Sequence, residues 1–167
     1  MKNIVLIGMP GTGKSTVGVL LAKSLLMDFV DTDLIIQKEF SCSLCDIIEK
    51  EGIASFIETE NRIIAKTDFS SCVVATGGSA VYGKEAMKKL SENGVTVYLK
   101  TPLRELEKRL KNIHTRGVAM KKGTTVEELM REREPLYEKY ADITVECEGL
   151  TAEECVQKIV DSLKECE

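Results

Sequence analysis

Residues 8–15 read Gly-Met-Pro-Gly-Thr-Gly-Lys-Ser, and this octapeptide decides the fold. It satisfies the pattern G-x-x-x-x-G-K-[ST], which joins a strand to a helix. The chain supplies both neighbours, because an apolar run at residues 4–7 precedes the pattern and a helical periodicity over about residues 14–27 follows it. We therefore predict a buried strand, a glycine-rich loop and a helix in direct succession.

The composition of this loop indicates phosphate binding. Its glycines allow successive N–H groups to turn inward around a phosphate, and the positive end of the helix dipole adds to the attraction. Lys14 is expected to reach the β- and γ-phosphates of a nucleoside triphosphate, and the Ser15 hydroxyl to bind Mg²⁺. The residues expected to contact the nucleotide here are Gly11, Thr12, Gly13, Lys14, Ser15 and Thr16.

The rest of the chain alternates apolar runs with helical patterns. Further strands are predicted at about residues 29–30, 72–75, 95–99 and 143–145. Helices are predicted over about residues 33–40, 44–66 with a break near Gly52, 84–92 and 126–139, with others beginning at Pro102 and Thr151. Continuous apolar strands separated by helices indicate a parallel sheet covered on both faces, so we predict a single α/β domain over residues 1–167.

Composition excludes several classes of protein. The 167 residues fit one compact domain, and 43% hydrophobic with 30% charged residues is an ordinary globular mixture. A net charge of −4 argues against nucleic acid or an anionic membrane as the main partner. The apolar stretch at residues 4–7 is too short for a secretion signal or a membrane span, so we expect a cytoplasmic protein.

The cysteines do not indicate a metal or redox site. Cys42 and Cys45 form a C-x-x-C pair, but a structural zinc needs four ligands, and the only histidine is His114. Ser43 and Asp46 have the spacing of a helix capping box, which explains the same segment locally. The six cysteines are therefore expected to be reduced thiols.

Polar residues follow the other strands at the edge where parallel sheets bind ligands. Asp31 and Asp33 end the second strand, where one carboxylate is expected to support Mg²⁺ through water and the other to accept a proton or hydrogen bond from a substrate hydroxyl. An alternative role for this segment is to cap the following helix. At the third strand end, the backbone at residues 76–79, including Gly77, is expected to approach a ligand closely.

Arginines lie in and after a glycine-containing basic segment at residues 114–125, which we predict to be a mobile loop. Arg116 in this loop has the character of an arginine that closes over a transferring phosphoryl group. Arg131 and Arg133 lie on the next helix, where an arginine is suited to hold a carboxylate in bidentate fashion. Taken singly, each is better explained as an exposed, solvated side chain.

Together these residues resemble the shikimate kinases, the small P-loop enzymes of aromatic amino-acid biosynthesis. The resemblance covers nearly the whole chain, including residues 8–16, 29–33, 75–78 and 133–137, Phe56, Glu60 and Arg116. It implies a three-layer P-loop NTPase fold with a five-stranded parallel sheet, helices on both faces and a lid over about residues 112–125. It also implies ATP and Mg²⁺ as cofactors, and phosphorylation of a ring hydroxyl of shikimate.

For the acceptor side, the resemblance implies that Asp33 orients the accepting hydroxyl. The backbone of Gly78 would contact the substrate, and Arg133 would hold its carboxylate. The helical region over about residues 33–65 would form the acceptor-binding part of the domain.

For the donor side, the resemblance implies that Asp31 supports magnesium through water. Arg109 would lie against adenine, and Arg116 would be the lid arginine.

The sequence departs from the family pattern on the acceptor side. The family's Phe-Arg-x-x-Glu is present with Ile57 in place of the arginine, its third consecutive glycine is Ser79, and its lid Arg-Pro-Leu-Leu is Arg-Gly-Val-Ala at residues 116–119. Losing one charged hydrogen bond to the carboxylate costs about 1.5–3 kcal/mol.

These departures leave alternatives beside shikimate. A kinase of the same scaffold with a hydroxy amino acid such as homoserine as acceptor is one, and a nucleotide-binding regulator without turnover is another. A nucleoside monophosphate kinase is a weaker alternative, because no second arginine cluster is evident for an acceptor phosphate. In each case we expect a monomer with a small-molecule partner.

Overall fold

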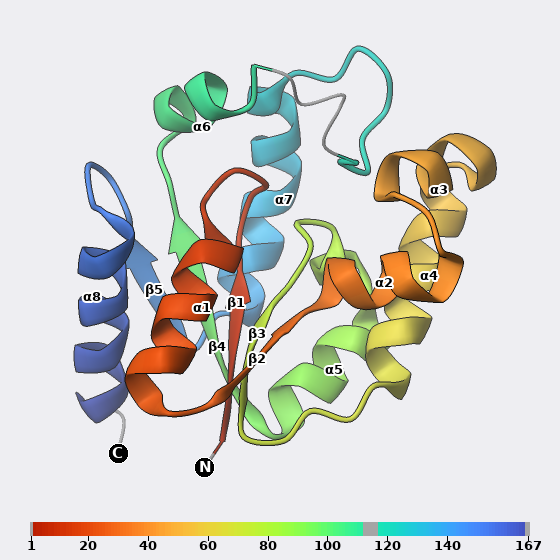
Figure 1. Cartoon of the computed structure of the whole chain (residues 1–167). Helices are drawn as coiled ribbons and strands as arrows, with labels where there is room; N and C mark the ends of the chain where they lie inside the picture. Colours follow the sequence, from red (N-terminus) through yellow and green to blue (C-terminus); the bar gives the residue numbers. More distant parts are fainter. Residues whose placement is uncertain (1, 112–116, 166–167) are drawn as a thin grey trace.

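A computed structural model describes residues 2–111 and 117–165 (Figure 1). In this part of the chain, five strands form one sheet in the order β2-β3-β1-β4-β5, and each neighbouring pair is parallel. The predicted parallel sheet is thereby confirmed. The strands are β1 (Asn3–Ile7), β2 (Asp28–Asp31), β3 (Cys72–Ala75), β4 (Gly94–Lys100) and β5 (Ile143–Glu146).

The helices also follow the predicted pattern. The first ends two residues earlier than predicted, because Leu26 adopts a left-handed conformation with φ of 56°. The break at Gly52 is confirmed, whereas a short 3₁₀ helix, η1 (Ala80–Tyr82), was not predicted. The helices are α1 (Lys14–Leu25), α2 (Thr32–Phe40), α3 (Leu44–Glu51), α4 (Ile53–Lys66), α5 (Lys84–Glu92), α6 (Leu103–Arg109), α7 (Val126–Tyr140) and α8 (Ala152–Glu165).

The sheet is covered on both faces, which makes three layers (Figure 1). Successive side chains of a strand point to opposite faces. Ile4 and Leu6 of β1 therefore pack toward α1 and α8, whereas Val5 and Ile7 pack toward α5 and α7. Burial on both faces explains why the central strands β1 and β3 are buried along their whole length and read as apolar runs in the sequence.

A third apolar cluster holds α2, α3 and α4 together beside the sheet (Figure 1). It includes Phe56 and Ile63 of α4, and Ile57 packs against it. This helical unit, the loop after β1 and the segment after β3 all lie at the carboxyl ends of the parallel strands. The topology therefore brings residues distant in sequence to one edge of the sheet.

Candidate active site

The loop between β1 and α1 adopts a backbone that requires glycine. Gly8, Gly11 and Gly13 have φ angles of 145°, 84° and 92°. At Gly8, an added Cβ would lie 2.7 Å from the main-chain oxygen of Leu99. The predicted strand–loop–helix arrangement is confirmed, and α1 begins at Lys14, where its free N–H groups and dipole favour an anion.

Lys14 is held inside this loop. Its side chain is buried, and Nζ donates hydrogen bonds to the main-chain oxygens of Gly8 at 2.8 Å and Met9 at 2.9 Å. Burial lowers the pKa of Lys14 to about 8, against the opposing effect of the Asp33 carboxylate. A cationic amine is thus positioned at the loop, and no described carboxylate pairs with it in hydrogen-bond contact.

Asp31 makes the helix-capping contact that the sequence allowed, and its second oxygen faces the phosphate loop. One carboxylate oxygen accepts a hydrogen bond from the Asp33 N–H at 3.0 Å and so caps α2. The other accepts from the Ser15 hydroxyl at 2.7 Å. A carboxylate and a hydroxyl side by side at a phosphate loop are the oxygen ligands that Mg²⁺ prefers, so the donor set fits this metal.

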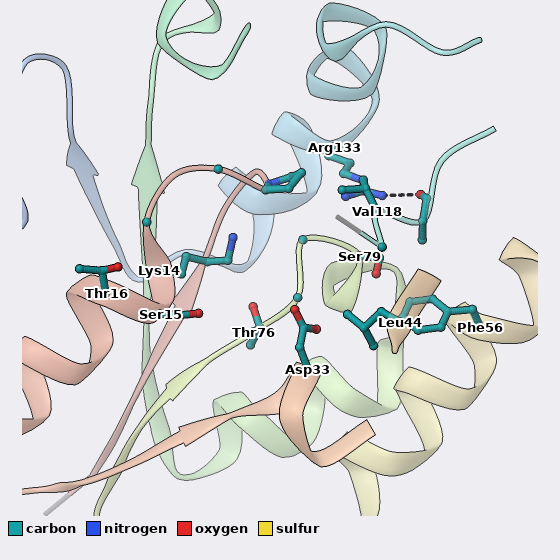
Figure 2. Close-up of a pocket in the computed structure, with 17 residues that line it drawn as sticks. Lys14, Ser15, Thr16, Asp33, Leu44, Phe56, Thr76, Ser79, Val118 and Arg133 are labelled. Atoms are coloured by element: carbon teal, nitrogen blue, oxygen red, sulfur yellow. Dashed lines mark hydrogen bonds between the residues drawn. The ribbon is translucent and has the colours of Figure 1, made fainter. Parts of the chain in front are cut away.

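Asp33 points in a different direction from Asp31, because the chain changes from strand to helix between them. Figure 2 shows its carboxylate directed toward the cavity that Lys14 also faces. Burial, and then the charge of Asp31, raise the pKa of Asp33 to about 6, although Lys14 acts in the opposite direction.

Glu60 is a polar group at this site that was not among the predicted site residues. It is 1% exposed, and one carboxylate oxygen accepts a hydrogen bond from the Ser79 hydroxyl at 2.5 Å. Burial raises the pKa of Glu60 to about 7, despite that hydrogen bond. A Cβ on Gly77 would lie 2.7 Å from the second oxygen of Glu60 and 2.7 Å from Asp33 Oδ1, so glycine is needed between the two carboxylates.

Arg133 is buried, with 1% exposure, whereas the Arg131 side chain is 76% exposed and pairs with Glu127. The guanidinium of Arg133 donates to the Tyr82 hydroxyl at 3.3 Å and to the Ala119 main-chain oxygen at 2.7 Å. Further N–H groups of the fork remain for a ligand. The interpretation of Arg133 as a solvated surface residue is wrong, because the face of the helix that carries Arg133 packs toward the cavity.

Lys14, Asp33 and Arg133 face one cavity of about 290 Å³ (Figure 2). Lys14, Ser15, Asp33, Gly77, Gly78 and Arg133 line it, together with Gly11, Gly13 and Thr16 of the first loop and helix. Its apolar wall comes from Leu44, Phe56, Val118 and Ala119. A basic phosphate loop, a carboxylate and a buried guanidinium therefore face a single space.

A second cavity of about 200 Å³ lies beside the first helix. Thr12, Gly13 and Thr16 border it, together with Arg109 and residues of the segment between β5 and α8. Arg109 donates to the Gly11 main-chain oxygen at 3.1 Å and to the Glu105 carboxylate at 3.1 Å. The predicted nucleotide residues thus border two cavities that share Gly13 and Thr16.

Other residues singled out in the sequence lie outside this cavity or outside the described part of the chain. Arg116 lies outside the residues that the structure describes. Ile57 does not line the cavity but packs on the apolar cluster of α2–α4. Within residues 2–111 and 117–165, Cys42 and Cys45 belong to no group of ligands suited to a metal ion, and no helix is long and apolar enough to cross a membrane.

The fold and the site define a class. A parallel five-stranded sheet with a phosphate loop after β1, facing a carboxylate and an arginine across one cavity, is the arrangement of a P-loop phosphotransferase acting on a hydroxyl group. A family model described as shikimate kinase matches residues 10–164. The chain belongs to the shikimate kinase family.

Individual relatives agree with this assignment. The chain is 41% identical over 163 residues to the shikimate kinase of Thermodesulfovibrio yellowstonii, covering 96% of this chain and 94% of that protein. It is 39% identical over 168 residues to that of Francisella tularensis subsp. novicida, covering 98% and 96%. The structure of the Acinetobacter baumannii shikimate kinase in complex with shikimate superimposes with a TM-score of 0.92 at 30% identity, covering 100% of this chain and 95% of that one.

Proposed function

We propose that this enzyme transfers the γ-phosphoryl group of ATP to a ring hydroxyl of shikimate, with Mg²⁺ as its metal. The observation that carries the proposal is the cavity that Lys14, Asp33 and Arg133 share. In-line phosphoryl transfer requires the donor phosphate and the accepting hydroxyl to meet in one space closed to water. Its similarity to a kinase solved with shikimate bound supports the choice of acceptor.

On the donor side, the loop N–H groups and Lys14 would hold the phosphates. Lys14 exchanges its two main-chain carbonyl partners for phosphoryl oxygens, and Arg109 lies against the base in the second cavity. Ser15 and, through water, Asp31 would hold Mg²⁺, which when bound neutralises charge on the phosphates. Arg116 keeps its proposed role as the arginine that closes over the transferring group.

On the acceptor side, Asp33 orients the hydroxyl and accepts its proton as the bond to phosphorus forms. A carboxyl with a pKa near 6 is ionised at neutral pH and is a stronger base than an ordinary aspartate. The backbone of Gly77 and Gly78 bounds the ligand closely, and the Arg133 fork holds the acceptor carboxylate.

The loop at residues 117–120 contributes to water exclusion. Val118 and Ala119 line the cavity, and the Ala119 carbonyl accepts from Arg133. Gly117, with φ of 65°, lies against Leu44 at the start of α3, where an added Cβ would approach Leu44 to 2.6 Å. The apolar wall therefore closes over the reacting groups and protects ATP from hydrolysis.

A coupled assay of ADP release tests the proposal. Shikimate, homoserine and other hydroxy acids are compared as acceptors under identical conditions with MgATP. We expect the highest kcat/KM with shikimate. A higher kcat/KM with homoserine would show that the loss of arginine at Ile57 has changed the acceptor, and no product with any acceptor would favour a nucleotide-binding regulator.

The pH dependence of kcat/KM follows from two pKa values of the free enzyme. Because the pKa of Asp33 is raised to about 6, this carboxyl becomes protonated and inactive as a base as the pH falls through 6. Because the pKa of Lys14 is lowered to about 8, its positive charge is lost as the pH rises through 8. We expect a bell-shaped profile with its maximum between these values, measured with shikimate and MgATP both well below their KM values so that the free enzyme titrates. A flat profile from pH 5 to 9 would contradict these assignments.

Substituting Arg133 with lysine should weaken acceptor binding specifically. Lysine cannot form the planar fork, and it cannot keep the hydrogen bonds to both Tyr82 and Ala119. We expect KM for shikimate to rise by about ten- to a hundredfold, with KM for ATP little changed.

Arg131→Lys is the matched control, since Arg131 lies on the same helix but is exposed. Equal effects of the two substitutions on KM would argue against a carboxylate site at Arg133.

A further inference from the structure

Ser79 occupies a special position in the cavity. It follows Gly77 and Gly78 directly and precedes η1, and its side chain is only 5% exposed but lines the same space as Asp33 and Arg133 (Figure 2). All four residues between β3 and η1 line the cavity, and Thr76 and Ser79 are the two among them that carry a side chain. Any acceptor held between Asp33 and Arg133 therefore lies close to Ser79.

The single proton of this hydroxyl is committed to Glu60. Ser79 Oγ donates to Glu60 Oε2 at 2.5 Å, and Glu60 Oε1 has no hydrogen-bond partner among the described residues. Above its pKa of about 7, Glu60 is an ionised buried carboxylate, and it would lose the one hydrogen bond that the structure gives it if Ser79 turned its proton toward a ligand. Leaving a buried charged group unsatisfied is costly, so the proton stays on the Glu60 side.

A serine whose proton is committed can only accept hydrogen bonds from a ligand. Ser79 lines the cavity, so a group on the acceptor that reaches its oxygen must be a donor. A carboxylate or phosphate oxygen would be repelled there, whereas a hydroxyl fits. Asp33 takes the reacting hydroxyl in the proposed function, so the group facing Ser79 is a second one.

We propose that Ser79 is a specificity-determining residue that accepts a hydrogen bond from a non-reacting hydroxyl of the acceptor, and that Glu60 is the positioning residue that fixes Ser79 in this orientation. The inference rests on the proposed function, since shikimate carries ring hydroxyls beside the one that is phosphorylated. It assigns a role to Ser79, which replaces the third glycine of the family pattern.

The test compares shikimate with analogues that lack one non-reacting hydroxyl each, using wild-type enzyme, Ser79→Ala and Ser79→Thr. For wild type, we expect one analogue to lose about three- to tenfold in kcat/KM through Ser79. In Ser79→Ala, KM for shikimate should rise by the same factor with kcat within about twofold, and the discrimination against that analogue should fall correspondingly. Ser79→Thr keeps the hydroxyl and should retain the discrimination.

Two variants test Glu60. Glu60→Gln keeps an oxygen acceptor for the Ser79 hydroxyl and should preserve the discrimination, whereas Glu60→Met removes it and should lower the discrimination. Ser55→Ala is the matched control, because it deletes a serine–glutamate hydrogen bond to Glu51 on the surface away from the cavity. Thermal unfolding of each variant shows whether it is folded.

The outcomes separate this inference from the proposed function. If wild-type enzyme does not phosphorylate shikimate, the proposed function fails and the inference fails with it. If wild type phosphorylates shikimate but Ser79→Ala discriminates among the analogues as wild type does, or if wild type discriminates against none of them, only the inference is overturned. Since the last comparison uses wild type alone, it holds even if Ser79→Ala does not fold.

Discussion

Lys14→Met is expected to lower kcat with shikimate and MgATP by about a thousandfold. Methionine has nearly the same length as lysine, so it removes the charge with little change of volume. The loss reflects a preorganised cation that stabilises charge developing on the transferring phosphoryl group in a site with little water. The measurement is steady-state turnover by ADP release, with calorimetric titration of MgADP to separate binding from catalysis.

Lys23→Met provides the control for this result. Lys23 lies in the last turn of the same helix and is exposed, so its charge is screened by solvent and its removal should leave kcat unchanged. Turnover of Lys14→Met within tenfold of wild type would contradict the role given to Lys14.

Asp33→Asn is expected to lower kcat by about a hundred- to a thousandfold, because the amide cannot accept the proton of the attacking hydroxyl. The acid limb of the pH profile near pH 6 should disappear in this variant, since the group that produces it is gone. The hydrogen bond that caps α2 is made by the N–H of residue 33 and should survive, so the fold is expected to be retained.

Asp28→Asn is the corresponding control. Asp28 begins β2, the strand that leads into α2, at the end away from the cavity and is exposed. A variant Asp33→Asn that kept an acid limb near pH 6 would show that another group, such as the buried Glu60, produces it.

Local signals were sufficient to predict the sheet and the phosphate loop. β1 and β3 are fully buried, which makes an apolar run a reliable sign of a strand. The loop was readable because its glycines and Lys14 are adjacent in sequence. The capping box predicted at Ser43 and Asp46 is present, and Thr125 and Glu128 form another at the start of α7.

The acceptor side was harder to predict because its contacts are distant in sequence. Ser79 and Glu60 are separated by a strand and a loop, and neither residue type alone indicates a buried pair. Arg133 lies in a highly charged helix whose other arginine is exposed, so only the packing of α7 against the cavity distinguishes it. The different directions of Asp31 and Asp33 likewise depend on where the strand ends and the helix begins.

The most direct test of the account is ³¹P NMR of wild-type enzyme incubated with shikimate and MgATP. The account predicts a new phosphomonoester resonance, formed in equal amount with ADP and split by coupling to a ring proton, and its absence when shikimate is omitted or Lys14→Met is used. ADP formed together with free inorganic phosphate alone, or no reaction with folded enzyme, would contradict the claim that the loop at residues 8–15 and the cavity of Asp33 and Arg133 form one phosphoryl-transfer site.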